Sequence, residues 1–466
     1  MTIRTVGPTA DFPSIAAAMN VAGPGDTIQL LDGYSNETAT VRFSGMTIFG
    51  GSSSVGIVLG LAQGIATVTL TGTAPIRLHD AIDGNGIVGN GGDNIITVTG
   101  GIDAVDGGLG ADRLIVDYRQ AVGAITGDST SHFSEAGGGG RSVNITAGTI
   151  EHFTILTGSG ADTITTGAGN DIIRTGQGAS TVTAGQGMNL IYGGGDSDTV
   201  TGLDGGNTVH LGGGTNTATT GAGDDRIFSG KGSDTVVTGA GADVIQLRGG
   251  ADGVDAGAGN DRLVIDYAAM TTNVTGGITG GTAASGYVGH IADLLGSLVD
   301  FERADNFTIT TGSGDDRVTT GSGMDVLRGS DGSDLLRAGG GQDRLFGGAG
   351  QDRLLGGLGR DVLIGEAGAD VFVFATVKEA GTLANHDTIN DFQTGRDHIG
   401  LAGIDANRLL TGDQAFDFIG SADFTAAGQL RFSGGMVRGD VDGDGQADFA
   451  IQIGPQPGLT DADFYL

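Results

Sequence analysis

The most regular pattern in this chain is an apolar residue that recurs every nine positions with polar neighbours on both sides. In GGAGQDRLLGGLGRDVLIGEAGADVFVF, which runs from Gly347 to Phe374, the recurring positions are Leu354, Leu363 and Phe372. Each is the middle of a triplet such as RLL, and alternate residues of a strand point to opposite faces. Glycine clusters between the triplets supply the positive φ angles that sharp turns need. The pattern therefore predicts short strands, each with one buried residue, joined by tight turns.

The nine-residue period runs through three blocks of the chain. The first spans 80–115 with about four units, the second spans 157–264 with twelve, and the third spans 311–373 with seven. Nine residues make a turn and a strand, so eighteen complete a coil with two parallel strands. Stacked coils bury a column of Leu, Ile and Val, and each coil depends on its neighbours. We predict an all-β fold, a parallel β-roll or β-helix solenoid with an N-terminal β-helix-like cap and a C-terminal β-rich domain.

The segments outside the blocks complete the predicted domain organisation. Residues 1–79 contain a short helical pattern, a Pro-Gly turn and strands, which predicts a cap on the first coil. Segments 116–156 and 265–310 interrupt the period, each leaving through an Asp-Tyr strand and returning through a Phe-Thr-Ile strand. Two interpretations of these inserted loop segments stay open: ligand or partner sites, or local caps that widen one coil. We favour the second. Residues 374–466 lack the period and form the last domain.

Composition narrows the classes of function. Only six of the 55 acidic residues are Glu, which indicates short Asp carboxylates placed beside turns rather than charge for solubility alone. The net charge of −32 argues against nucleic acid or an anionic membrane surface as a partner. The chain has no Cys for disulfides or thiolate metal sites. No stretch is long and apolar enough for a membrane span, and we expect no N-terminal signal peptide.

The sixth position of each repeat is the candidate metal ligand. On one edge of a stack these carboxylates recur every eighteen residues at ~4.8 Å, and at that spacing two charges repel by roughly 3.5 kcal/mol at an effective dielectric of about 20. A divalent cation between coils removes the repulsion. Ca²⁺, with six or more oxygen ligands at ~2.3–2.6 Å, suits Asp carboxylates and turn carbonyls better than Mg²⁺ does. The predicted repeat ligands are Asp112, Asp162, Asp171, Asp225, Asp234, Asp243, Asp261, Asp316, Asp325, Asp334, Asp343, Asp352, Asp361 and Asp370.

The middle of the second block departs from this pattern. Its sixth positions include Ser180, Asn189, Asn207 and Asn216, with Asp198 alone among them. Neutral oxygens bind calcium more weakly, and neutral neighbours need no counter-ion. We expect turns near 175–220 to hold calcium poorly or not at all, with Asn hydrogen bonds in its place. Asn94 makes one site of the first block equally doubtful.

A separate calcium-loop pattern stands near the C-terminus. The stretch DVDGDGQAD places Asp440, Asp442, Asp444 and Asp448 at positions 1, 3, 5 and 9, with glycine at position 6. In such loops alternate side chains converge on one ion. The twelfth position is Ile rather than Glu, so an EF-hand proper is not expected. The four residues are predicted metal ligands, with a plain Asp-rich hairpin turn as the alternative.

The three blocks resemble the RTX (hemolysin-type) calcium-binding repeats, G-G-x-G-x-D-x-U-x, over 23 nonapeptides or some 207 residues. The resemblance implies Ca²⁺ bound by the turns, folding on reaching external calcium, and export by a type I secretion apparatus to an extracellular or cell-surface location. HDTINDFQTGRDHIGL and the stretch around DVDGDGQAD resemble the C-terminal domain of serralysin-type proteins, and DADFYL resembles the uncleaved type I export signal. The start, with FPSIAAAMNVAGPGDTIQL, resembles pectin-lyase-type β-helices.

The search for catalytic motifs gives no catalytic residue. HExxH and GxSxG motifs are absent, no dinucleotide fingerprint occurs outside the repeats, and the seven His have no metal-ligand spacing. We therefore expect a calcium-binding secreted RTX protein with a structural, surface or matrix role, more plausible as a non-enzyme, with cell-surface or matrix glycans as candidate partners. The alternative is an extracellular polysaccharide-active lyase or epimerase on a β-helix scaffold.

Overall fold

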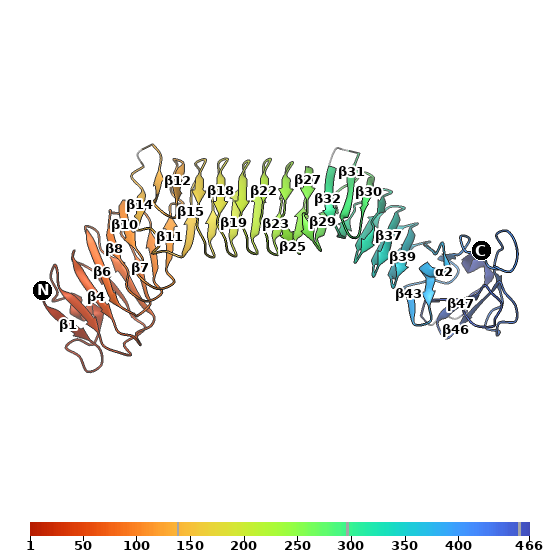
Figure 1. Ribbon diagram of the computed structural model, residues 1–466, viewed down its shortest axis with the longest axis horizontal. Coiled ribbons are helices and arrows are strands. Elements are labelled where there is room, and N and C mark those ends of the chain that lie inside the picture. The colour runs from red at the N-terminus through yellow and green to blue at the C-terminus, as the bar shows by residue number, and fades with distance from the viewer. Residues whose placement is uncertain (138, 295–297, 455–457) are drawn as a thin grey trace. The chain divides into compact units, whose positions relative to one another are not determined.

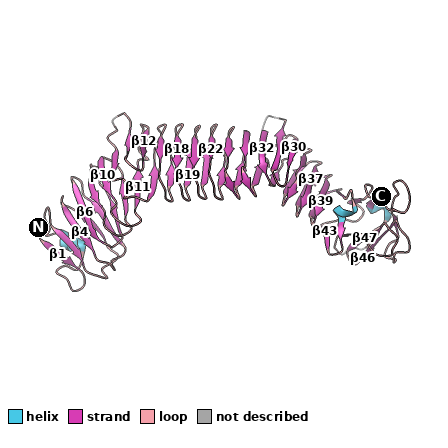
Figure 2. Ribbon diagram, in the orientation of Figure 1, coloured by secondary structure: helices cyan, strands magenta, loops and turns pink. Residues whose placement is uncertain are grey.

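The structure of the chain is a computed structural model. It describes residues 1–137, 139–294, 298–454 and 458–466. The chain forms two compact units, residues 1–230 (unit 1) and residues 231–466 (unit 2). Strands dominate both units, as Figure 1 and Figure 2 show, and strand accounts for 47% of the chain against 3% for helix. The predicted all-β parallel solenoid is confirmed.

Unit 1 is a parallel β-solenoid whose coils alternate between two ladders of strands. In spatial order, ladder A of unit 1 contains β1 (Ile3–Val6), β2 (Thr27–Leu30), β4 (Met46–Gly50), β6 (Thr67–Gly72), β8 (Gly86–Val88), β10 (Ile102–Asp106), β14 (Ser142–Ile145), β13 (His132–Glu135), β12 (Ile125–Asp128), β16 (Thr163–Thr165), β18 (Thr181–Ala184), β20 (Thr199–Gly202) and β22 (Thr217–Thr219). Ladder B of unit 1 contains β3 (Thr38–Val41), β5 (Ile57–Leu61), β7 (Ile76–His79), β9 (Ile95–Val98), β11 (Arg113–Asp117), β15 (His152–Leu156), β17 (Ile172–Arg174), β19 (Leu190–Gly194), β21 (Thr208–Gly212) and β23 (Arg226–Phe228).

The core of the solenoid is a column of apolar side chains, one from each short strand. Ile164 of β16 pairs in register with Val182 of β18, which pairs with Val200 of β20. All three side chains are buried. Their neighbours in each triplet point outward, because successive residues of a strand face opposite sides. The buried middle residue that the sequence predicts for each triplet is therefore observed.

A short helix covers the start of unit 1. Helix α1 (Ile15–Met19) begins after Ser14, whose Oγ accepts a hydrogen bond from the backbone N–H of Ala17 at 3.0 Å. This is a standard N-cap, which satisfies one of the free N–H groups of the first turn. Ile15 and Met19 are buried, so the helix closes the apolar column where the coils begin.

The first inserted segment continues ladder A instead of leaving the solenoid. Strand β14 pairs in parallel with β10, β13 pairs antiparallel with both β14 and β12, and β12 pairs in parallel with β16. Ladder B passes directly from β11 to β15 at this level. Ladder A thus gains two strands that ladder B lacks. The segment therefore widens one coil on the side of ladder A, and its role stays a prediction; residue 138 lies outside the described residues.

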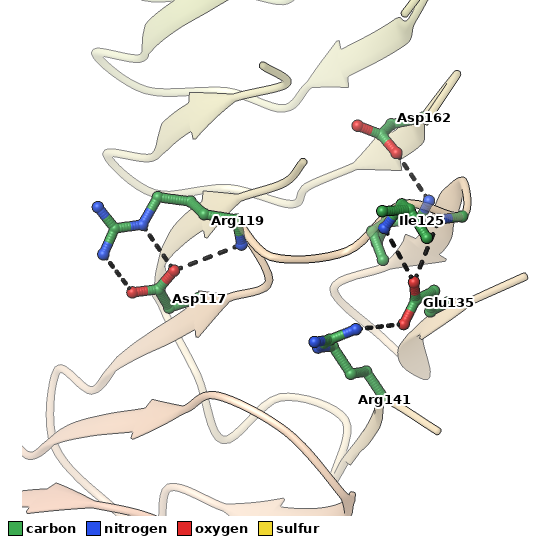
Figure 3. Close-up of polar contacts among 8 residues, drawn as sticks. Asp117, Arg119, Ile125, Glu135, Arg141 and Asp162 are labelled. Atoms are coloured by element: carbon green, nitrogen blue, oxygen red, sulfur yellow. Dashed lines mark hydrogen bonds and ion pairs between the residues drawn. The ribbon is translucent and has the colours of Figure 1, made fainter. Parts of the chain in front are cut away.

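Polar contacts fix this widened coil, as Figure 3 shows. Oδ1 of Asp162 accepts a hydrogen bond from the backbone N–H of Ile125 at 2.7 Å, which joins the insertion to the next coil. Glu135 forms an ion pair with Arg141 at 2.7 Å, and both lie within the insertion. The other carboxylate oxygen of Glu135 accepts hydrogen bonds from backbone N–H groups of the preceding turn. The ends of the inserted strands are therefore held by their own side chains.

Unit 2 repeats the two-ladder arrangement. In spatial order, its ladder A contains β24 (Thr235–Val237), β27 (Ala251–Asp255), β32 (Leu298–Ala304), β31 (Gly286–Asp293), β30 (Val274–Thr282), β34 (Arg317–Thr319), β37 (Leu335–Gly341), β39 (Arg353–Gly359), β41 (Val371–Val373), β44 (His398–Gly400) and β49 (Phe464–Tyr465). Its ladder B contains β26 (Val244–Leu247), β29 (Arg262–Asp266), β33 (Asn306–Thr310), β36 (Val326–Asp331), β38 (Arg344–Gly350), β40 (Val362–Gly368), β43 (Asn385–Ile389), β48 (Phe449–Gln452), β47 (Met436–Asp440), β46 (Gln429–Ser433) and β45 (Asp417–Phe418).

The second inserted segment has the topology of the first. Strands β30 and β31 are antiparallel, as are β31 and β32, while β32 pairs in parallel with β27 and β30 with β34. Residues 295–297 of this segment lie outside the described residues. Short pairs complete the turns: β25 (Ala240–Gly241) with β28 (Ala258–Gly259), and β35 (Ser322–Gly323) with β37.

The ladders of unit 2 continue beyond the last nonapeptide. Strand β43 pairs in parallel with β40, β44 with β41, and β49 with β44. Helix α2 (Val377–Ala380) and strand β42 (Gly381–Thr382) lie between β41 and β43, and a 3-10 turn (Asp461–Asp463) precedes β49. Strands β46, β47 and β48 form an antiparallel meander. Among the described residues, no helix combines the length and apolar character needed to cross a membrane.

Candidate calcium sites

The sixth-position aspartates form hydrogen-bonded rows along the edges of the solenoid. In the third block, Oδ1 of Asp334 accepts a hydrogen bond from the backbone N–H of Asp316 at 2.8 Å. Asp352 accepts in the same way from Asp334 at 2.8 Å, and Asp370 accepts from Asp352 at 3.0 Å. All fourteen predicted repeat ligands are at most 2% exposed. Each carboxylate lies just before a strand, so the stacking of coils brings it against the next turn. In the third block, one oxygen of each sixth-position carboxylate is therefore committed to the backbone.

The second oxygen of most of these carboxylates has no hydrogen-bond partner. This holds, among the described residues, for buried Oδ2 of Asp112, Asp171, Asp261, Asp316, Asp325, Asp334, Asp343, Asp352, Asp361 and Asp370. A buried charge without a partner is strongly unfavourable. Buried polar atoms in native proteins almost always have a partner, so a row of such atoms indicates a group that the chain is built to receive. Carboxylate oxygens beside turn carbonyls are the donor set that Ca²⁺ prefers.

The raised pKa values of carboxyl groups in these rows also indicate a place for a cation. Burial, with the neighbouring charges of Asp316 and Asp352, raises the pKa of Asp334 to about 8. Burial and its own neighbours raise the pKa of Asp343 to about 8 and that of Asp370 to about 7. Without a cation, the folded rows favour protonated carboxyl groups near neutral pH. A bound divalent cation would remove this cost.

Asparagine turns show where a positive group fits. The side-chain amide of Asn189 donates to the carbonyls of Gly185 and Gly187 at 2.9 and 3.3 Å, and to Oδ1 of Asn207 at 2.9 Å. Asn207 donates in the same way to positions two and four of its own turn, both at 2.9 Å. The amide nitrogen therefore occupies a point where three oxygens converge. The expected Asn hydrogen bonds are confirmed, and poor calcium binding there stays a prediction.

The first residue of each repeat shapes a second part of the site. A Cβ added to Gly329 would collide with Oδ2 of Asp334 and with the carbonyl of Gly347. In repeats that begin with Thr, the side chain fills this space: Thr311 Oγ1 donates to the carbonyl of Gly329 at 2.8 Å. Its hydroxyl also opposes the rise in the pKa of Asp316 that burial causes. Gly-first turns let Oδ2 of the carboxylate lie close to the backbone of the first residue, whereas Thr-first turns place a hydroxyl there.

Several aspartates outside the predicted set occupy equivalent positions. Burial raises the pKa of Asp103 to about 7, that of Asp198 to about 6, that of Asp252 to about 7 and that of Asp387 to about 8. Asp387 accepts the backbone N–H of Asp361 at 2.7 Å and so extends one row past the repeats. A strict count of nine through LRGGADGVD finds Asp252.

Asp397 extends the other row in the same way. It accepts the backbone N–H of Asp370 at 3.1 Å and is buried. Intervals of 26 and 27 residues hide Asp387 and Asp397 from a period of nine. The triplets that follow them, TIN and HIG, still have the form of a repeat strand.

The predicted calcium loop brings three of its four residues together. One ligand atom from each of Asp440, Asp442 and Asp444 lies within 4.8 Å of the others, with Asp440 buried and the other two exposed. Asp448 is turned to the backbone instead, where Oδ2 accepts from the N–H of Val441 at 2.6 Å. Both oxygens of Asp440 accept N–H groups of glycines in the loop. The loop therefore has the shape of the predicted turn, with a smaller cluster than the spacing suggests.

The three blocks of this chain match a known family of repeats. The model of the RTX calcium-binding nonapeptide repeat (4 copies) matches residues 87–117, 154–182, 174–209, 183–218, 201–236, 210–245, 230–263, 308–327, 319–354 and 346–374. No curated protein matches the chain. The matched residues carry the buried aspartate rows described above. The chain therefore contains RTX hemolysin-type calcium-binding repeats, folded as a parallel β-solenoid.

Proposed function

We propose that this chain is a secreted RTX protein whose solenoid folds on external calcium and then serves as a structural, surface or matrix protein. The observation that carries the proposal is the row of buried, partnerless Oδ2 atoms of Asp334, Asp352 and Asp370. Each of these repeats begins with a glycine, which lets Oδ2 of the carboxylate lie close to the backbone of that residue. Bound calcium would supply the positive charge that lets these carboxylates stack.

The residues that would hold calcium follow from the two rows of the third block. On one edge they are Asp334, Asp352 and Asp370, and on the other Asp343 and Asp361. Turn carbonyls at positions two and four complete the donor set, because the Asn189 amide finds the equivalent carbonyls in its own turn. Without the ion, repulsion along each row adds to the large conformational entropy of a chain with 94 glycines. Metal binding and folding are therefore coupled.

Export would use the unfolded state. We propose that low internal calcium keeps the chain unfolded while a type I secretion apparatus threads it, and that millimolar external calcium completes the fold outside the cell. The acidic-then-apolar tail DADFYL and the serralysin-like segment support this route by resemblance. Deletion of the last six residues should abolish export from a host that carries the apparatus, whereas calcium-dependent folding of the rest of the solenoid should persist.

Circular dichroism of the full chain tests the coupling. In calcium, we expect the β-sheet spectrum of the solenoid; after chelation, we expect the spectrum of a largely unfolded chain, restored when calcium is returned. Magnesium serves as the control cation, and it should restore little because it keeps its waters and demands a tighter octahedron. A spectrum that is the same with and without chelator would contradict the proposal.

A further inference from the structure

Four consecutive strands of ladder A in unit 1 present threonine at both outward positions. Strands β16, β18, β20 and β22 carry the triplets TIT, TVT, TVT and TAT, whose middle residues are buried. The outward residues are all exposed or half-exposed. We call the following eight side chains the threonine array: Thr163, Thr165, Thr181, Thr183, Thr199, Thr201, Thr217 and Thr219.

The threonine array is a regular two-dimensional lattice. Thr163, Thr181, Thr199 and Thr217 pair directly from strand to strand and form one row, and the second residues of the triplets form the other. No register shift interrupts these pairings, and the strands stack side by side (Figure 1). Adjacent strands are ~4.8 Å apart, and residues two apart in a strand are separated by ~6.7 Å. The array therefore repeats at about these two spacings.

The array is specific to this face of the coils. Ladder B of the same coils carries Arg174, Tyr192, His210 and Phe228, whose three rings stack with centroids 4.6 and 4.4 Å apart. Threonine is favoured in strands generally, but that preference does not select one face. Eight uncharged, identical side chains on one face indicate a selected surface.

The array is rigid and its hydrogen-bonding groups face solvent. A β-branched side chain has few χ1 rotamers, so each Thr holds its methyl and hydroxyl in a restricted orientation. Among the described residues, none of the eight hydroxyls hydrogen-bonds to another group of the protein. Little side-chain entropy is lost when such a surface binds. Its natural partner is a surface that repeats its own hydrogen-bonding groups at matching intervals.

We propose that the threonine array binds ice. Faces of hexagonal ice present rows of water oxygens with repeats close to the two spacings of the array, so methyl and hydroxyl groups can meet the lattice at eight points together. The eight side chains of the array carry no charge that would hold liquid-like hydration. Crystalline polysaccharide is a poorer fit, because sugar rings pack on aromatic side chains and the array contains none; the aromatic residues of these coils lie on ladder B.

The test compares one substitution on the two faces of the same solenoid. Thr199→Tyr places a bulky side chain in the array, and Thr208→Tyr makes the same change at the same repeat position on β21 of ladder B. Both residues flank a buried Val, and Tyr is well accepted in strands. Full-length proteins in calcium are cooled beside a single ice crystal, and the gap between melting and freezing points is measured. Circular dichroism in calcium confirms that each variant is folded.

We expect wild type and Thr208→Tyr to shape the crystal and to hold its growth below the melting point, and Thr199→Tyr to lose this gap. A folded wild-type protein with no gap would overturn the proposal, as would equal loss in both variants. Binding to microcrystalline chitin or cellulose that Thr199→Tyr abolishes, without activity on ice, would also overturn it. Because folding is read separately, failure on ice leaves the calcium proposal untouched.

Discussion

The third block and the middle of the second block build the same coil from opposite chemistry at the turns. Residues 311–373 place a buried Asp at every sixth position, and most of the second carboxylate oxygens have no partner. Residues 181–219 place Asn at three of four sixth positions, and the Asn189 and Asn207 amides join the oxygens of their turns. The backbone ladder is alike in both. The comparison teaches that one backbone coil accepts either side chain, so we expect a need for an ion to come from the charge of the sixth residue alone.

Chelation should separate the two regions most strongly. Residues 311–373 lose the counter-ion of their rows, whereas amide hydrogen bonds hold residues 181–219 without one. After calcium is removed, we expect backbone amides of the third block to exchange with solvent faster by roughly tenfold or more, with a smaller change in the middle of the second block. Hydrogen exchange resolved by mass spectrometry measures both in one sample. Equal loss of protection in the two regions would break the comparison.

Neutralising one carboxylate should destabilise the calcium form of the third block. Asp352→Asn removes a buried charge from a row, and loss of one partner of a buried ionic contact costs roughly 3 kcal/mol or more. The matched control is Asp331→Asn, an exposed residue of the same block. Urea unfolding in calcium, followed by circular dichroism, measures the difference in the free energy of unfolding. If both variants unfold alike, Asp352 does not hold an ion.

Metal-free protein should respond to pH with a sign set by the raised pKa values. Burial and neighbouring charge raise the pKa of Asp334 and Asp343 to about 8 in the folded chain, against about 3.9 for an unfolded Asp. The folded state then binds more protons, so its stabilisation is complete below about pH 4 and is lost as pH rises to about 8. In chelator, we expect β-structure to be gained on acidification from about pH 8. A metal-free chain that is most folded at alkaline pH would contradict this.

The smallest predicted effect concerns the first position of the repeat. Gly347→Thr would bring a Cβ into collision with Oδ2 of Asp352 and within 2.9 Å of the carbonyl oxygen of Gly365, so the carboxylate has to move. The displaced carboxylate should weaken calcium binding at that turn. Gly340→Thr is the control, because a Cβ there lies no closer than 3.5 Å to any atom. Calorimetric titration measures the calcium affinity of both variants. If the two affinities are equal, the first residue of the repeat has no influence on calcium binding.

The sequence predicts the solenoid well because a period of nine ties turn, carboxylate and apolar residue together. Leu354 and Phe372 lie in register and are buried, as the alternation of the triplet requires. The period also places Asn at the sixth position of some turns, and from this the sequence predicts the Asn hydrogen bonds there. It does not predict that Oδ1 of each sixth-position Asp in the third block accepts a backbone N–H, since that contact joins residues in different coils.

Two further features of the structure cannot be predicted from the nine-residue period. Asp387 and Asp397 extend the rows after intervals that the period does not contain, because helix α2 and the turn before β44 are inserted. The antiparallel strands β12, β13 and β14 enter ladder A through pairings that only the fold decides. Asp448 shows the opposite case. Its spacing in the sequence fits a calcium loop, but in the structure its Oδ2 accepts a hydrogen bond from the backbone N–H of Val441.

A crystal structure of the calcium-loaded protein, with ions located by anomalous scattering, tests the central claim most directly. The account predicts calcium beside Asp334, Asp343, Asp352 and Asp361, and none where the Asn189 and Asn207 amides meet their turn carbonyls. Calcium at the Asn turns, or turns of the third block without calcium at saturating concentration, would contradict it.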